Sequence, residues 1–138
     1  MRSLLLLFTC LLAPLSLTAE VEVPTLAESI ATQTEKISKI DPSDTRKLCE
    51  AYAYRAIIFL AYKDYQNSLE DYLTAKALHN PTINTFDNYF RLYTIVLGER
   101  ICYLNLNAKK EAARASKELQ IIDAHLDSLL QITLPRYP

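Results

Sequence analysis

The sequence is nearly free of glycine: it has one among 138 residues, where about 7% is usual. This scarcity excludes glycine-rich phosphate-binding loops and disfavours hairpin turns that need positive φ angles. Histidine occurs twice, and none of the three cysteines forms a Cys-x-x-Cys pair. The close ligand spacing of structural metal sites is therefore missing from the sequence. We predict neither a bound metal nor a cofactor.

An excess of charge of either sign is also lacking. The chain has 15 Lys and Arg against 16 Asp and Glu, for a net charge of −1. This balance gives no electrostatic reason to bind nucleic acid or an anionic membrane, so neither is predicted as a partner. Half of the residues are hydrophobic and 22% are charged, which is typical of a globular domain. With so little glycine, the composition favours helices.

Residues 1–19 have the three-part pattern of a secretory signal. Arg2 provides a basic start, a leucine-rich stretch without charge follows, and the predicted cut comes after Ala19. The segment is shorter than the roughly 20 apolar residues of a membrane-spanning helix. Lipid attachment at Cys10 and an N-terminal core helix are the alternatives. The favoured interpretation is an exported protein, periplasmic or secreted, in which residues 20–138 form one helical domain without an integral membrane span.

Caps and hydrophobic spacing predict five helices and no strand in the remainder of the chain. The first begins with a capping box, in which Thr25 and Glu28 satisfy each other's free groups. The other four are predicted from their caps and apolar stripes over these ranges: from Asp41 or Ser43 to 62, 65–79 after Asp64, 84–104 after an Asn84 cap, and 108–131.

The last predicted helix carries a narrow apolar stripe. Its members recur at alternating spacings of three and four residues and are Ala108, Ala112, Ala115, Leu119, Ile122, Leu126 and Leu129. Such a stripe is a heptad seam, typical of a helix that packs lengthwise against another helix. The seam either covers the preceding helices of the same chain or joins two copies of the protein.

Small and aromatic residues are placed regularly along the second and third predicted helices. They are Tyr52, Ala56, Phe59, Tyr65, Ser68, Tyr72 and Ala75. With this pattern, residues 49–82 resemble a tetratricopeptide repeat, a helix–turn–helix unit of 34 residues. Small residues let the two helices approach, and aromatic side chains fill the gaps beside them. Arg55 and Lys63 depart from the family, since they replace its leucine and its turn glycine.

A second, weaker copy of the pattern follows. Leu97 and Gly98 stand where the family has its Leu-Gly pair, and Gly98 comes 42 residues after Ala56. The turn after it is about two residues longer than the family pattern allows. The resemblance therefore implies a capping first helix, one good repeat over 44–82 and one degenerate repeat over 84–132.

The resemblance also implies a ligand surface. In tetratricopeptide proteins the first helix of each pair lines a concave groove that binds peptides. The positions carried over to this chain are Glu50, Ala53, Tyr54, Ile57 and Ala61, with Leu92, Val96, Glu99 and Tyr103 from the second copy. This surface is expected to be apolar, with two acidic side chains. The alternative is that the first or the fifth helix fills the groove within the chain.

Cys49 and Cys102 are the cysteines that remain after export. An oxidising compartment permits a disulfide between them, although buried free thiols are the more frequent outcome. A zinc site that adds His79 and His125 to these cysteines would need four separate helices to converge.

No combination of nucleophile, base and acid stands out in the sequence. Glu70 and Asp71 are adjacent, but neighbouring residues on a helix do not face each other, so both are expected on a solvated face. We therefore predict a non-enzymatic exported module that binds a protein or peptide. The alternative is a structural protein that self-associates through its C-terminal heptad seam.

Overall fold

The computed structural model describes residues 24–133. Five helices and no strand are formed in this part of the chain, which confirms the all-α prediction. The bounds are Leu26–Ser38 for α1, Thr45–Ala61 for α2, Tyr65–Leu78 for α3, Phe86–Asn105 for α4 and Lys109–Thr133 for α5. The predicted signal segment, 1–19, lies outside the described residues.

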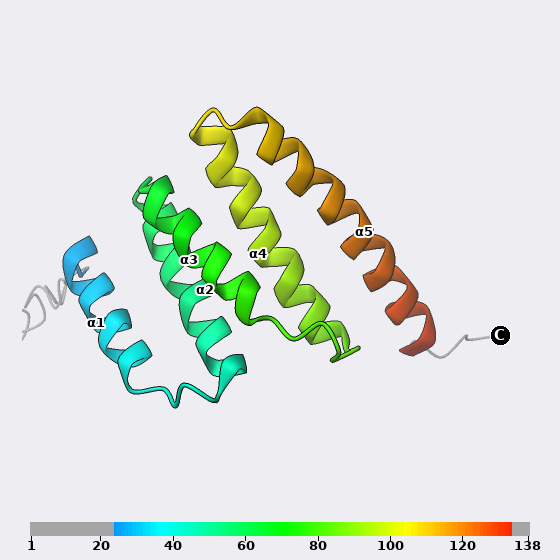
Figure 1. Ribbon diagram of the computed structural model, residues 1–138, viewed down its shortest axis with the longest axis horizontal. Coiled ribbons are helices and arrows are strands. Elements are labelled where there is room, and N and C mark those ends of the chain that lie inside the picture. Colours follow the sequence, from blue (N-terminus) through cyan, green and yellow to red (C-terminus); the bar gives the residue numbers. More distant parts are fainter. Residues whose placement is uncertain (1–23, 134–138) are drawn as a thin grey trace, which may run out of the picture.

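The helices form a short array of antiparallel pairs (Figure 1). α2 packs on α3 as one hairpin, and α4 packs on α5 as a second one. The two hairpins meet where α3 contacts α4, while α1 packs against α2 at the opposite end from α5 (Figure 1). This arrangement is the helix-pair array predicted from the sequence, and it is compatible with a helical-repeat fold.

Two of the predicted helix starts are confirmed in detail. The Thr25 backbone N–H and hydroxyl each donate to Glu28 Oε2 at 2.8 Å, and Glu28 N–H donates back to Thr25 Oγ1 at 3.3 Å. This reciprocal capping box begins α1. Asp64 caps α3 by accepting a hydrogen bond from the Asn67 N–H at 3.3 Å. Both caps satisfy N–H groups that the helix itself cannot pair.

Two other caps differ from the prediction by one to three residues. α2 begins after Asp44, because Asp41 is already used in the preceding turn, where it accepts hydrogen bonds from the N–H and hydroxyl of Ser43. α4 begins after Thr85 rather than Asn84. Each cap is the polar residue directly before the first helical turn.

The two hairpins are closed by turns of the same construction. Residues 62–64 join α2 to α3, and residues 106–108 join α4 to α5. In each turn the three backbone N–H groups donate to carbonyls four, three and five residues back. The middle residue is left-handed in both, with φ of 63° at Lys63 and 59° at Asn107. Equivalent residues of the two hairpins are therefore 44 positions apart, not the 42 that Gly98 had indicated.

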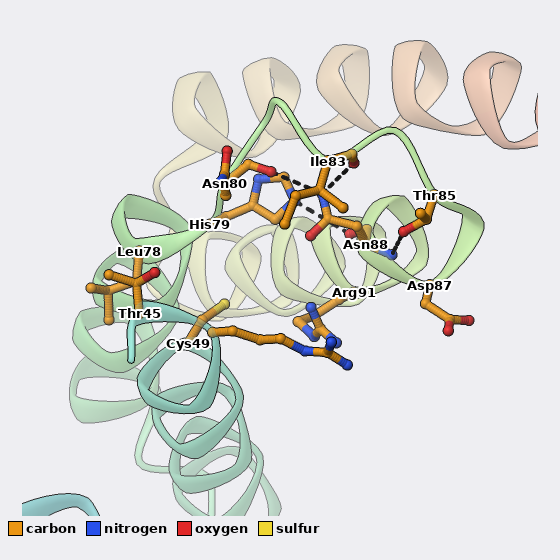
Figure 2. A pocket seen from close by; sticks show the side chains of 11 residues that line it. Thr45, Cys49, Leu78, His79, Asn80, Ile83, Thr85, Asp87, Asn88 and Arg91 are labelled. Atoms are coloured by element: carbon orange, nitrogen blue, oxygen red, sulfur yellow. Dashed lines mark hydrogen bonds between the residues drawn. The ribbon is translucent and has the colours of Figure 1, made fainter. Parts of the chain in front are cut away.

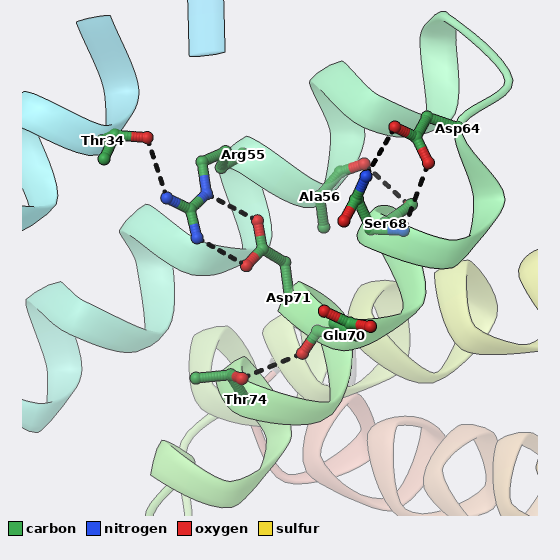
Figure 3. Close-up of polar contacts among 9 residues, drawn as sticks. Thr34, Arg55, Ala56, Asp64, Ser68, Glu70, Asp71 and Thr74 are labelled. Atoms are coloured by element: carbon green, nitrogen blue, oxygen red, sulfur yellow. Dashed lines mark hydrogen bonds and ion pairs between the residues drawn. The ribbon is translucent and has the colours of Figure 1, made fainter. Parts of the chain in front are cut away.

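The first hairpin is interlocked as the sequence predicted. Ala56, Ser68 and Ala75 are fully buried, and Tyr72 is 3% exposed between the helices. The Ser68 hydroxyl donates to the Ala56 carbonyl at 2.8 Å, which shows how closely α2 and α3 approach (Figure 3). Tyr52 is half-buried beside this contact. Small residues thus bring the two helices together and aromatic rings close the gaps.

Gly98 has a different role from the one predicted. It had been assigned to the small site inside the second pair, but it contacts the first hairpin instead. A Cβ atom at Gly98 would lie 2.1 Å from Cζ of Tyr72 on α3. The lone glycine of the chain is therefore required where the two hairpins meet, because the tyrosine ring occupies the space of a side chain.

The heptad seam of α5 is used inside the chain. Ala115, Ile122 and Leu126 are buried together with Val96 of α4, and Leu119 packs beside them. These seam residues therefore cover α4 within the chain, which is the first of the two interpretations given for the seam.

Among the helices of residues 24–133, none combines the length and the apolar character needed to cross a bilayer.

Candidate functional site

The α2 half of the predicted binding surface is open to solvent. Tyr54 and Ile57 are 55% and 52% exposed, and Glu50 and Ala61 are exposed on the same stripe. These four residues recur at spacings of four, three and four, so they share one face of the helix. Ala53 is half-buried at the edge of this stripe. Large apolar side chains are thus left in water on α2.

The α4 half of the predicted surface is wrong. Val96 is fully buried, Glu99 is 2% exposed and Tyr103 is 8% exposed, while Leu92 is half-buried. The reason is the register. These residues were placed 42 positions after their α2 equivalents, whereas the turns set the spacing at 44. Two residues rotate a position by about 200° around a helix, which turns it from the open face to the core.

Positions on α4 that lie 44 residues after the α2 stripe include residues that are open to solvent. The equivalents of Glu50, Ala53 and Ile57 are Thr94, Leu97 and Ile101. Tyr54 corresponds instead to the buried Gly98 and Ala61 to Asn105, and Leu104 lies further along α4. Thr94 is exposed, Leu104 is 48% exposed, and Leu97 and Ile101 are half-buried. We call the six apolar residues of these two stripes the α2/α4 face: Tyr54, Ile57, Ala61, Leu97, Ile101 and Leu104.

An ion pair connects the two helices that carry this face. Arg91 on α4 lies 2.7 Å from Oε1 of Glu50 on α2. Arg46 contacts the same oxygen at 3.2 Å. Glu50, predicted as an acidic member of the binding surface, is therefore neutralised by two guanidinium groups, and the face is left mainly apolar.

A buried ion pair holds α1 and α3 to α2. Nε and Nη2 of Arg55 donate to the two carboxylate oxygens of Asp71 at 2.7 and 2.8 Å (Figure 3). Nη1 of Arg55 donates to the Thr34 hydroxyl on α1 at 2.9 Å. These hydrogen bonds from Arg55 to Asp71 raise the pKa of Arg55. Asp71 is 5% exposed, so its predicted place on a solvated face is wrong, whereas Glu70 is exposed.

A second polar cluster joins α3, α4 and α5. Lys76 lies 3.3 Å from Oε2 of Glu99 and 2.7 Å from Oε2 of Glu118. Within the described residues, Oε1 of Glu99 has no hydrogen-bond partner. Burial raises the pKa of Glu99, and the nearby Lys76 opposes this shift. The cluster lies on the side of α4 turned away from the α2/α4 face, so it stabilises the array and takes no part in the open stripe.

Cys49 and Cys102 are buried free thiols, so the disulfide considered from the sequence is not formed between them. Cys102 Sγ donates to the Ser68 hydroxyl at 3.4 Å. Burial raises the pKa of both thiols, which disfavours the thiolate form that reacts. Both residues therefore pack as small apolar side chains.

Within residues 24–133, no group of three or more His, Cys, Asp and Glu side chains could hold a metal ion.

The α2/α4 face is thus defined by the positions of its residues on the two helices and by their exposure to solvent. No protein family, no curated protein and no solved structure matches this chain.

Proposed function

We propose that the chain is an exported, non-enzymatic module of tetratricopeptide-like design that binds a protein or peptide partner. The α2/α4 face is its binding surface, and the partner contributes an apolar helix face or extended segment. One observation carries this proposal. The first helices of the two hairpins both leave large apolar side chains in water, Tyr54 and Ile57 on α2 and Leu104 on α4, and Ile101 lies half-buried at the position equivalent to Ile57.

The energetics of the face suit a partner of this kind. Removing a large apolar side chain fully from water stabilises a complex by about 1.5–3 kcal/mol. Tyr54, Ile57 and Leu104 are each about half exposed and retain much of this free energy for a partner. Association and side-chain ordering offset part of the gain, so the face supports a reversible interaction. The leucine-rich residues 1–19 support export as the setting in which the partner is met.

The test places a photocrosslinking amino acid at Ala61, on the exposed face, in cells that make the full chain. The expected result is one discrete adduct, and its yield should fall strongly in the Ile57→Asp variant, because a carboxylate would be buried in the contact. The matched control is Ile121→Asp on α5, since Ile121 is 72% exposed and lies away from the face. An adduct that survives Ile57→Asp, or equal losses in both variants, would overturn the proposal.

Export is tested separately by N-terminal sequencing of the protein from the periplasm or medium. A mature chain that starts at Glu20 is expected. An intact N-terminus in the cytoplasm would contradict this part of the proposal and leave the binding face unaffected.

A further inference from the structure

A pocket with a volume of about 280 Å³ lies outside the α2/α4 face, at the end of the array where α2 begins (Figure 2). Three segments form it: the first turns of α2, the connection from α3 to α4, and the first turns of α4. Its lining side chains include Cys49, Leu78, His79, Ile83, Arg46 and Arg91. The volume is just below the range of pockets that hold drug-sized ligands, so it fits a smaller molecule.

One wall of the pocket carries two guanidinium groups. Arg46 and Arg91 both contact the same carboxylate oxygen, Oε1 of Glu50, at 3.2 and 2.7 Å. Two guanidinium groups thus share one carboxylate, and guanidinium is the side chain best suited to pair with further oxyanions. Asp87 also lines the pocket, but its carboxylate points away from the guanidinium groups (Figure 2).

The opposite wall is held in shape by a buried asparagine. Asn88 is 4% exposed, and its side-chain amide donates to the carbonyls of Asn80 and Ile83 at 2.9 Å each. His79 Nε2 lies 3.3 Å from the Asn88 carbonyl oxygen. These contacts fix the connection between α3 and α4. They hold Ile83 at the pocket, and Leu78 at the end of α3 is a second apolar lining residue. A ligand therefore meets apolar side chains that are already in place.

We propose that this pocket binds a small organic acid whose carboxylate pairs with Arg46 and Arg91, and whose short apolar chain lies against Leu78 and Ile83. The two guanidinium groups account for the charge of the ligand, the apolar side chains for its hydrocarbon part, and the volume for its small size. The site is separate from the α2/α4 face and does not depend on the function proposed for that face.

The experiment follows the two histidine side chains by NMR while acetate, butyrate or inorganic phosphate is added to the protein. Burial and the charge of Arg91 lower the pKa of His79, while its bond to Asn88 opposes this. Butyrate bound beside Arg91 should offset that charge and raise the pKa of His79. The signals of His125, which lies outside the pocket, should stay unchanged. Butyrate should also bind at least about tenfold more tightly than acetate, because two further methylene groups are buried.

Three variants complete the test. Arg46→Ala and Arg91→Gln should each weaken butyrate binding by about tenfold or more, as expected when a charge-assisted hydrogen bond is lost. Arg46 has a side chain that is 69% exposed, so its variant keeps the fold even if Arg91→Gln does not. Lys117→Ala, an exposed change on α5, is the control and should bind butyrate as the parent does. Absence of binding, equal binding of phosphate and butyrate, or equal weakening in the control would each overturn the proposal.

Discussion

The two hairpins close with the same turn, yet their interiors differ. Residues 55 and 99 are equivalent in the spacing of 44, and both carry a buried charge, of opposite sign: Arg55 and Glu99. Arg55 pairs within its hairpin with Asp71 and also reaches Thr34 on the preceding helix, α1. Glu99 finds its cation, Lys76, on the preceding helix, α3. In each hairpin this position therefore connects the first helix to the helix before it.

The comparison also shows which part of the interior is replaceable. The equivalent of Asp71 in the second hairpin is Ala115, which is buried against Val96 in an apolar seam. The same backbone turn is thus compatible with a polar interior and with an apolar one. The two hairpins share the turn geometry and the position of the connecting charge, but not the chemistry of their interiors. Four predictions test these shared and differing features.

The largest effect is expected from Asp71→Ala, which leaves the Arg55 guanidinium half enclosed and without its carboxylate. The loss should be about 3 kcal/mol in the free energy of unfolding, measured by urea denaturation. Glu70→Ala, on the adjacent exposed position, should change this free energy by less than about 0.5 kcal/mol. If the two variants were equally stable, the polar interior would not hold the first hairpin.

Gly98→Ala should destabilise the junction of the hairpins by about 2 kcal/mol, because the new methyl group would overlap the Tyr72 ring. This net value includes the gain of about 1 kcal/mol that alanine has over glycine in a helix. Once Tyr72→Leu has removed the overlap, the same substitution should instead stabilise the protein by up to about 1 kcal/mol relative to Tyr72→Leu alone. Thermal denaturation of the parent, the two single variants and the double variant measures the coupling energy between the two positions. If this energy were zero, the effect of Gly98→Ala would not come from overlap with Tyr72.

The two turns offer a smaller and more direct comparison. Lys63 and Asn107 have nearly the same left-handed φ, but asparagine tolerates this conformation better than lysine. Lys63→Gly should therefore stabilise the protein by about 1 kcal/mol, and Asn107→Gly by about half of that or less. Urea midpoints of the two variants, compared with the parent, check the order. The reverse order would show that the turns are not equivalent in energy.

The smallest effect concerns pH. Because burial raises the pKa of Glu99 above its usual 4.5, the folded state holds this proton more tightly than the unfolded state. The stabilising contribution is therefore complete below the unfolded pKa and is lost as pH rises through the folded pKa. Glu99→Gln should remove this loss, since Lys76 keeps its 2.7 Å contact with Glu118. Between mildly acidic and neutral pH, the free energy of unfolding should fall less for the variant than for the parent. An unchanged fall would assign it to another group.

Much of the fold could be predicted from local chemistry. The capping box of Thr25 and Glu28, the Asp64 cap and the heptad spacing of α5 each involve residues close in sequence, and each is observed. The α2 stripe was an implication of the tetratricopeptide resemblance, and it also lies on one helix. These features depend on one element at a time, which is why the sequence alone could indicate them.

The second half of the site could not be predicted, for a physical reason. Leu97 and Gly98 match the family pattern, but glycine is needed at this position because a tyrosine from another helix lies against it. In the sequence, a glycine needed for packing between hairpins cannot be distinguished from a glycine needed for packing within one hairpin. The turn residue Asn107 was the local signal that could have set the register, since asparagine favours the left-handed conformation. The arginine pocket draws on three segments, and no local pattern unites them.

The position shared by residues 55 and 99 has a consequence for how the molecule comes apart. Linear helical arrays can lose their end units one by one, because each unit touches its neighbours alone. Here the departure of α1 would uncover the Arg55 guanidinium, and separation of the hairpins would strip Glu99 of its lysine. Each such step therefore breaks a polar contact between neighbouring units in addition to their apolar packing, which disfavours the loss of single units and favours cooperative melting.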